Sequence, residues 1–160
     1  MSFFTTYSRK LENLIAVVIF LITFAVYFST MAPTVSFWDT GEFIATSHIL
    51  GVPHPPGSPL FLLVGKFFSL IPISSDIAYR VNIFSPIISA LTISLLFLIC
   101  NQFIDRVEPM DSNKFFKMWS SLTSSLTFAF THSHWFNAVE TEVYAFSGFM
   151  TALVIYLIMR

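Results

Sequence analysis

Two carboxylates and two histidines stand in a proline-rich segment directly after a long apolar run. The segment is SFWDTGEFIATSHILGVPHPPGSPL, and its ionisable side chains are those of Asp39, Glu42, His48 and His54. Asp39 follows Phe37 and Trp38, and a carboxylate in such apolar surroundings costs free energy unless it has a partner or a task. A carboxylate at a membrane surface can serve as a general base that removes a proton from an incoming hydroxyl group. Residue types and spacing therefore indicate acid–base chemistry at the edge of a membrane.

Helix capping is the main structural alternative for the acidic pair. Asp39 and Glu42 are three residues apart, so they share one face if the segment is helical. An N-cap Asp with a Glu at the third helical position resembles a capping box. The two roles are compatible, because a cap fixes the position of a carboxylate. Asp76, which follows two serines, is expected to be a helix N-cap.

His54, Lys66 and Arg80 are the candidates for binding the substrate or stabilising its charge. His54 lies in GVPHPPGSP, where prolines restrict the backbone and predict a stiff turn. That histidine either caps the turn or contacts the substrate. Cationic groups such as Lys66 and Arg80 can stabilise negative charge that develops on a leaving group.

A second acidic group lies in NAVETEVYAF, before the last apolar run. If this segment is extended, Glu140, Glu142 and Tyr144 point the same way; if it is helical, Glu140 and Tyr144 align instead. Either arrangement allows the segment to face the first acidic loop. Two acids among histidines can also bind a divalent cation, but their spacing matches no metal motif, so we expect no metal.

The composition is that of an integral membrane protein. The 160 residues are 55% hydrophobic and 11% charged, whereas soluble domains carry about 25% charged residues. A net charge of −1, with no basic patch, argues against a nucleic-acid partner. The single Cys100 excludes an intrachain disulfide.

The hydropathy pattern predicts an all-α, polytopic helical bundle with a long first outer loop. The third predicted span is rich in Ser and Thr, so it should face other helices rather than lipid. The outer loop contains an apolar helix too short to cross, which is expected to be interfacial or re-entrant. We also expect the chain to be the N-terminal part of a larger membrane protein. The predicted spans are 14–32, 81–103, 118–136 and 143–159, with the outer loop at 33–80 and its short helix at 59–71.

The distribution of Lys and Arg predicts a cytoplasmic N-terminus. Positive residues are enriched in cytoplasmic loops, and this orientation leaves only Lys66 and Arg80 outside. Both acidic segments then share the periplasmic or luminal face. The basic residues placed in the cytoplasm are Arg9, Lys10, Arg106, Lys114, Lys117 and Arg160.

An acid at that face fits a glycosyltransferase that uses a polyprenyl-phosphate sugar. The acid would deprotonate the acceptor hydroxyl, the lipid phosphate would leave at headgroup depth, and apolar helices would hold the lipid tail. The sugar, with mannose as one candidate, would pass to a protein or glycan. Membrane lipid and the lipid-linked sugar are thus expected partners, and no nucleic acid is.

Two long segments resemble a membrane family of GT-C glycosyltransferases that is related to protein O-mannosyltransferases and was long labelled as of unknown function. They are APTVSFWDTGEFIATSHILGVPHPPGSPLFLLVGKFFSLIP and NAVETEVYAF. The resemblance implies a GT-C fold with a catalytic acid in the first outer loop. By match, Asp39 is the base, with Glu42 as the alternative or its partner; His54, Glu142 and Tyr144 are binding candidates. It also implies no metal, because GT-C enzymes that use lipid monophosphate sugars commonly work without one.

Two other functions remain open from the residues alone. A transporter would place ionisable residues inside its spans, near the midplane, whereas the acids here cluster at one surface. A non-catalytic or truncated membrane subunit would need only packing surfaces, such as Gly148 and Ala152, which are four residues apart.

Overall fold

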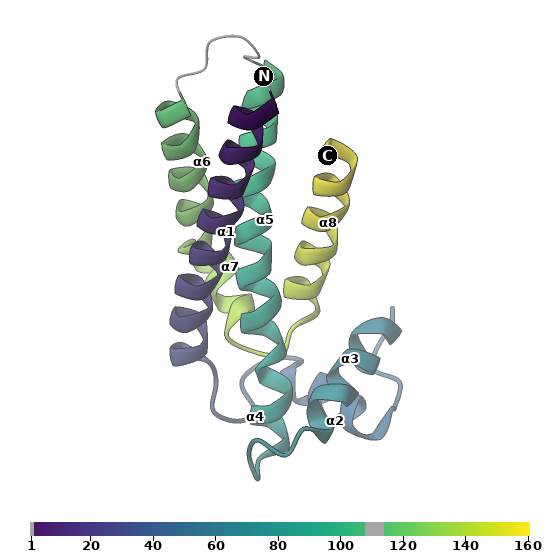
Figure 1. Ribbon diagram of the computed structural model, residues 1–160. Coiled ribbons are helices and arrows are strands. Elements are labelled where there is room, and N and C mark those ends of the chain that lie inside the picture. Colours follow the sequence, from purple (N-terminus) through teal and green to yellow (C-terminus); the bar gives the residue numbers. More distant parts are fainter. Residues whose placement is uncertain (1, 108–113) are drawn as a thin grey trace.

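The computed structural model describes residues 2–107 and 114–160, and every regular element in these two stretches is an α-helix (Figure 1). The all-α class predicted from the sequence is therefore confirmed. The helices are α1 (Ser2–Thr30), α2 (Thr40–Ile49), α3 (Pro59–Leu70), α4 (Ile77–Asn82), α5 (Phe84–Val107), α6 (Lys114–Ala129), α7 (His132–Ala138) and α8 (Val143–Met159).

Helix α5 is the centre of the molecule, with α1, α6 and α8 packed alongside it (Figure 1). Its side chains Ile93 and Phe97 are fully buried in the cluster shared with α1. Small polar residues on α5 let its neighbours approach closely, and the Ser94 hydroxyl donates to the Ala16 carbonyl of α1 over 2.8 Å. Such small residues are typical of helix contacts inside membranes.

Two helical stretches are long and apolar enough to cross a membrane, Arg9–Thr30 and Ile77–Val107. A third is present if α7 and α8, which meet at a bend of 109°, are counted as one broken span. Helix α6 has 16 residues, fewer than the ~20 that a full crossing requires.

The interval 118–136, predicted as one span, is divided between α6 and α7. Helix α6 ends at Ala129, and α7 begins at His132. The buried Tyr27 hydroxyl of α1 donates to the Ala129 carbonyl over 2.9 Å. The last carbonyl of α6 therefore has a hydrogen-bond donor without a further turn of helix. A tertiary hydrogen bond of this kind has no signature in local hydropathy.

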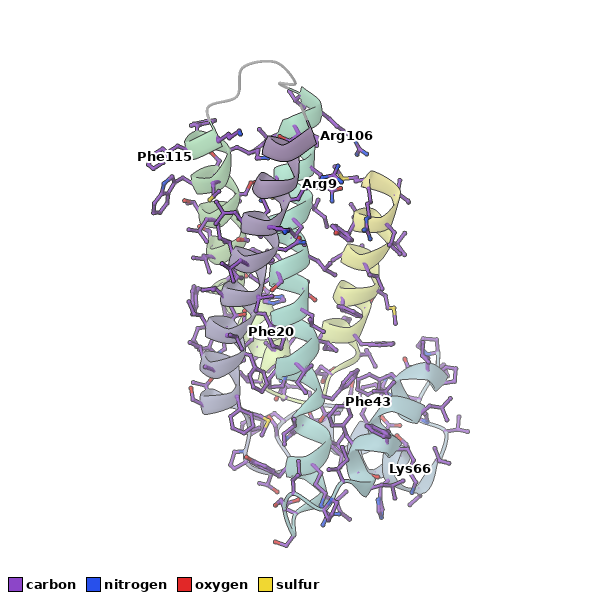
Figure 2. The ribbon with its side chains drawn as sticks, viewed as in Figure 1. Arg9, Phe20, Phe43, Lys66, Arg106 and Phe115 are labelled. Carbon is purple, nitrogen blue, oxygen red and sulfur yellow. The ribbon has the colours of Figure 1, made fainter. Side chains whose placement is uncertain are left out.

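Labelled side chains mark the two ends of the bundle. Arg9, Arg106 and Phe115 lie at one end, and Phe43 and Lys66 lie at the other (Figure 2). The second end carries the short helices α2, α3 and α4 (Figure 1). Helices α2 and α3 lie between the two long apolar stretches, and α4 is the start of the second stretch, Ile77–Val107.

Helices α2 and α3 pack so closely that only glycine fits at their crossing. A Cβ atom added at Gly65 would lie 2.4 Å from Ser47 Oγ and 2.8 Å from Ser47 Cβ. At the start of α3, Pro59 stands in the first turn, where a missing N–H costs nothing. The close packing of these two helices holds α2, and with it the acidic pair, against the bundle.

We expect Gly65→Ala to destabilise the protein by ~1–3 kcal/mol, the usual cost of overpacking. Gly148→Ala is the matched control, because Gly148 lies in α8 with no atom within 4 Å of an added Cβ. There the gain in helix propensity should stabilise by up to ~1 kcal/mol. Thermal unfolding of the full-length protein in detergent measures both, and equal midpoints for the two variants would contradict the close contact.

Candidate functional site

Asp39 lies at the start of α2, but its carboxylate does not cap the helix. It occupies the N-cap position with φ −80° and ψ −1°, and its side chain makes no capping hydrogen bond. The preceding residue, Trp38, has φ 58°, a left-handed conformation that costs a bulky residue roughly 1–2 kcal/mol. The capping-box alternative is therefore wrong for this pair, and the Asp39 side chain, 59% exposed, is free for another role.

Glu42 is bound to His54 through both of its carboxylate oxygens. The His54 backbone N–H donates to Glu42 Oε1 over 2.8 Å, and His54 Nδ1 lies 2.7 Å from Oε2. These contacts with His54 lower the pKa of Glu42, and the hydrogen bond to Glu42 raises the pKa of His54. The pair is thus a charge-assisted bridge between α2 and the proline-rich turn.

Asp39 stands on the other side of the same imidazole ring. His54 Nε2 lies 4.0 Å from Asp39 Oδ2, at the limit of an ion pair. The ring of Phe43 packs against that of His54, with centroids 5.8 Å apart. The structure thus brings together Asp39, Glu42 and His54, three of the residues selected from the sequence.

Glu142 brings a buried carboxyl group from the segment before α8. It is 6% exposed, and it interacts electrostatically with Asp39, Glu140 and His54. Burial, followed by the neighbouring charges of Glu140 and Asp39, raises the pKa of Glu142 to about 7. This carboxyl group is therefore poised to hold or release a proton near neutral pH.

Glu140 is buried beside Glu142 but is tied to a different partner. It is 2% exposed, and the Ser36 hydroxyl donates to its Oε2. Tyr144, which the extended alternative aligned with both acids, is instead 68% exposed. The reason is that helix α8 begins at Val143, so the alternation of an extended segment stops before Tyr144.

The remaining cationic and histidine candidates make hydrogen bonds elsewhere. Lys66 Nζ donates to the His48 carbonyl, which ties α3 to α2. Arg80 donates to the carbonyls of Ser69 and Ser74. His48 Nδ1 lies 3.4 Å from Ser69 Oγ. These contacts brace α2, α3 and α4 against one another, and none of them reaches the cluster around His54.

Asp76 is a structural residue, as predicted. Its carboxylate accepts from the Ala78 N–H over 2.7 Å and so caps α4. A hydrogen bond from the Thr34 side chain is the main reason that its pKa is lowered.

The junction that joins the two acidic segments was missed from the sequence. The buried Asn82 side-chain amide donates to the carbonyls of Ala32 and Thr34, over 2.9 and 3.0 Å. Its oxygen accepts from the Thr141 hydroxyl, and the Ala32 N–H donates to the Val139 carbonyl over 2.8 Å. These bonds fix the chain before Asp39 beside the chain before Glu142. An Asn at the start of an apolar run was the available signal, because such a side chain needs partners in a membrane.

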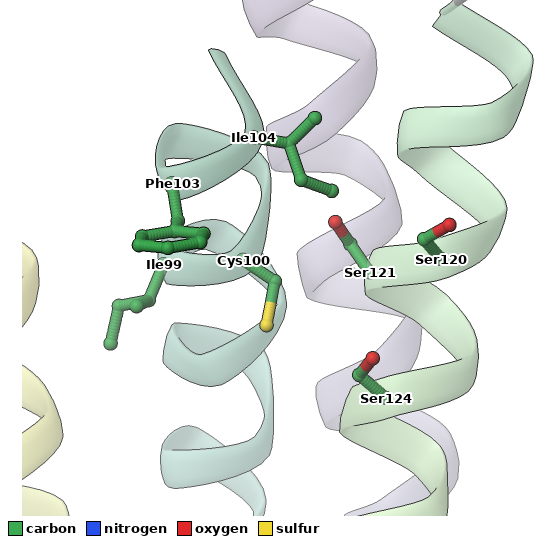
Figure 3. A pocket seen from close by; sticks show the side chains of 7 residues that line it. All are labelled: Ile99, Cys100, Phe103, Ile104, Ser120, Ser121 and Ser124. Atoms are coloured by element: carbon green, nitrogen blue, oxygen red, sulfur yellow. The ribbon is translucent and has the colours of Figure 1, made fainter. Parts of the chain in front are cut away.

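A shallow groove between α5 and α6 does not belong to this site (Figure 3). It lies in the part of the bundle near the C-terminal end of α5, away from α2 and α3. Hydroxyl groups, one thiol and apolar side chains line it, without a carboxyl group. The lining residues are Ile99, Cys100, Phe103, Ile104, Ser120, Ser121 and Ser124.

Comparison with known proteins identifies a family model and named relatives that are similar to this chain. Residues 39–160 match the family described as the N-terminal domain of protein O-mannosyl-transferase TMEM260. The chain is 28% identical over 143 residues to a Dictyostelium discoideum protein named protein O-mannosyl-transferase tmem260, covering 88% of this chain and 16% of that protein. It is 30% identical over 146 residues to the Mus musculus protein of the same name, covering 91% of this chain and 19% of that protein. The chain thus spans less than a fifth of the length of these relatives, and no solved structure matches it.

Proposed function

Since the chain belongs to the family of the N-terminal domain of protein O-mannosyl-transferase TMEM260, we propose that it carries the acidic site of a membrane glycosyltransferase. The enzyme moves a sugar, mannose by analogy with the relatives' names, from a polyprenyl-phosphate carrier to a hydroxyl group of a protein. The proposal rests on the position of the Asp39 carboxylate. This carboxylate does not cap α2, and it lies beside the Glu42–His54 pair and the buried Glu142.

Asp39 is the general base in this proposal. As the acceptor oxygen attacks the anomeric carbon, an Asp39 oxygen takes the hydroxyl proton, and the bond from that carbon to the phosphate oxygen breaks. Attack opposite to the leaving group inverts the anomeric centre. Glu42 holds His54 beside Asp39, and Glu142 supplies a carboxyl group that can be neutral near pH 7 and donate a hydrogen bond.

In this proposal the helices have a GT-C-like arrangement, and the lipid carrier lies along them. The acidic cluster lies at the end of the bundle that carries α2 and α3, whereas Arg9 and Arg106 lie at the opposite end (Figures 1 and 2). The enrichment of basic residues at that opposite end favours a cytoplasmic N-terminus and a site on the periplasmic or luminal face. The donor phosphate then sits at headgroup depth, with its tail along the apolar helices.

A transfer assay with two donors tests the proposal. The full-length protein, reconstituted in liposomes, is given radiolabelled mannose either on a polyprenyl phosphate or on a nucleotide, together with a hydroxyl-bearing acceptor domain. We expect label to reach the acceptor from the lipid-linked donor alone. Transfer from the nucleotide sugar in the absence of lipid carrier would contradict the proposed donor, and proton or solute flux without transfer would favour a transporter.

A further inference from the structure

Trp38 has a backbone conformation that its place in the chain does not explain. Among the described residues, three that are not glycine have a positive φ angle, namely Trp38 at 58°, Leu50 at 55° and Ser58 at 39°. Leu50 closes α2, and its N–H donates to the Thr46 carbonyl, which is the usual use of a left-handed residue. Trp38 instead precedes α2, and its bulk makes the left-handed conformation an outlier.

Hydrogen bonds on both sides of Trp38 hold this conformation in place. Before it, the Ser36 hydroxyl donates to the buried Glu140 carboxylate. After it, the Asp39 carbonyl accepts from the Phe43 N–H over 3.0 Å, in the first turn of α2. A strained residue that is fixed by its surroundings in this way is typical of active sites and ligand-binding segments.

The Trp38 side chain is open to the outside, although tryptophan is mostly buried in folded proteins. It is 83% exposed, so most of its indole ring is accessible to a ligand. Anchoring in the membrane interface is one use for an exposed tryptophan. A tryptophan with an ordinary φ angle anchors equally well, so anchoring does not account for the strained backbone.

The proposed reaction brings a sugar within reach of this ring. A general base lies ~3 Å from the hydroxyl oxygen whose proton it takes, and that oxygen lies ~3–3.5 Å from the carbon that it attacks. The anomeric carbon of the donor is therefore within ~7 Å of the Asp39 carboxylate. The Cα atom of Trp38 is only ~3.8 Å from that of Asp39, so its long side chain can contact the same sugar.

We propose that the indole ring of Trp38 packs against the pyranose ring of the lipid-linked donor and orients the anomeric carbon toward the acceptor hydroxyl. The C–H bonds on one face of a pyranose carry partial positive charge, and they are attracted by the negative face of an aromatic ring. The fixed backbone holds the indole ring ready before the donor arrives, which lowers the entropic cost of binding. This role of Trp38 rests on the proposed transferase function.

Donor binding by the full-length protein tests the proposal, because it requires no turnover. The protein is purified in detergent and titrated calorimetrically with a polyprenyl phosphate that carries mannose, and separately with the same polyprenyl phosphate without sugar. We expect Trp38→Leu to weaken binding of the sugar-bearing lipid ~10-fold, the factor that corresponds to an aromatic stacking contact. Its binding of the sugar-free lipid should be unchanged.

Two further variants serve as controls for the loss of the indole ring. Trp38→Phe keeps an aromatic face and should stay within ~3-fold of the wild type in its affinity for the sugar-bearing lipid. Trp119→Leu should bind both lipids as the wild type does, because Trp119 packs against Phe115 at the opposite end of the bundle (Figure 2).

Trp38→Gly separates sugar binding from a structural role. Glycine adopts a positive φ angle without steric cost, so this variant should unfold at a higher temperature than the wild type. It should also weaken binding of the sugar-bearing lipid as much as Trp38→Leu does. A tryptophan that served only the fold would lose stability on this change. Because glycine fits the backbone, Trp38→Gly also carries the test if Trp38→Leu fails to fold.

The outcomes separate this proposal from the proposed function. Equal affinity of the wild type and Trp38→Leu for the sugar-bearing lipid would overturn the role of Trp38. Equal weakening for both lipids would also overturn it, and would assign Trp38 to the membrane interface. Sugar-dependent binding that requires Trp38, in a protein that transfers no sugar to an acceptor, would contradict the transferase alone. A wild type that binds neither lipid would overturn both.

Discussion

Replacing Asp39 with Asn in the full-length protein is expected to lower the rate of sugar transfer by ~10²–10⁴-fold, the usual contribution of a general base. The Asn amide has the same shape as the Asp carboxylate, but it cannot take the proton from the hydroxyl group that attacks the sugar. Because the Asp39 side chain makes no capping hydrogen bond and is 59% exposed, the substitution should leave the stability nearly unchanged. Initial rates at saturating donor and acceptor, with unfolding midpoints measured in parallel, separate these two effects.

Asp76→Asn is the matched control for this prediction. Asp76 lies in the same segment between α1 and α5, and its carboxylate caps α4 through the Ala78 N–H. Asn caps helices about as well as Asp, so this variant should keep both its stability and its transfer rate. Undiminished turnover in Asp39→Asn would remove Asp39 from the role of base, and an equal loss in Asp76→Asn would assign both effects to disturbed folding of the outer segment.

The sequence was sufficient to predict the helical class, and it selected Asp39, Glu42 and His54, which the structure brings together. Hydropathy located the two long apolar helices, because burial in lipid requires continuous apolar length. The start of α3 at Pro59 and the cap at Asp76 followed from local backbone chemistry. Rules based on local sequence succeed at such positions because the interacting groups are only a few residues apart in the chain.

Contacts between distant residues were beyond the sequence. Nothing local indicates that Glu42 binds His54 rather than the start of α2, or that Lys66 binds the His48 carbonyl. The same is true of Asn82, which joins the segments around Ala32 and Thr141. Each of these bonds depends on how helices pack, so the geometry of the site emerges only once α2, α3 and α5 are placed together.

The largest expected effect on stability lies at the opposite end of the bundle, at Lys117 of α6. Its Nζ lies 2.8 Å from Glu12 Oε1 of α1 and 2.9 Å from both carboxylate oxygens of Asp105 of α5. Only 8% of the Lys117 side chain and 15% of that of Glu12 are exposed. One ammonium group thus joins three helices where water is scarce.

Lys117→Met is expected to destabilise the protein by ~3 kcal/mol, the lower end of the range for removing one partner of a buried ion pair. The lower end applies because Asp105 is 54% exposed and can be solvated.

Lys114→Met, one turn earlier on α6 and exposed, should change stability by less than ~0.5 kcal/mol. Adding Glu12→Gln and Asp105→Asn to Lys117→Met should recover part of the loss, because the cost arises largely from buried negative charge that loses the Lys117 ammonium group. Thermal unfolding of the four proteins in detergent measures this, and a triple variant no more stable than Lys117→Met would show that the lysine acts through packing of its alkyl chain instead.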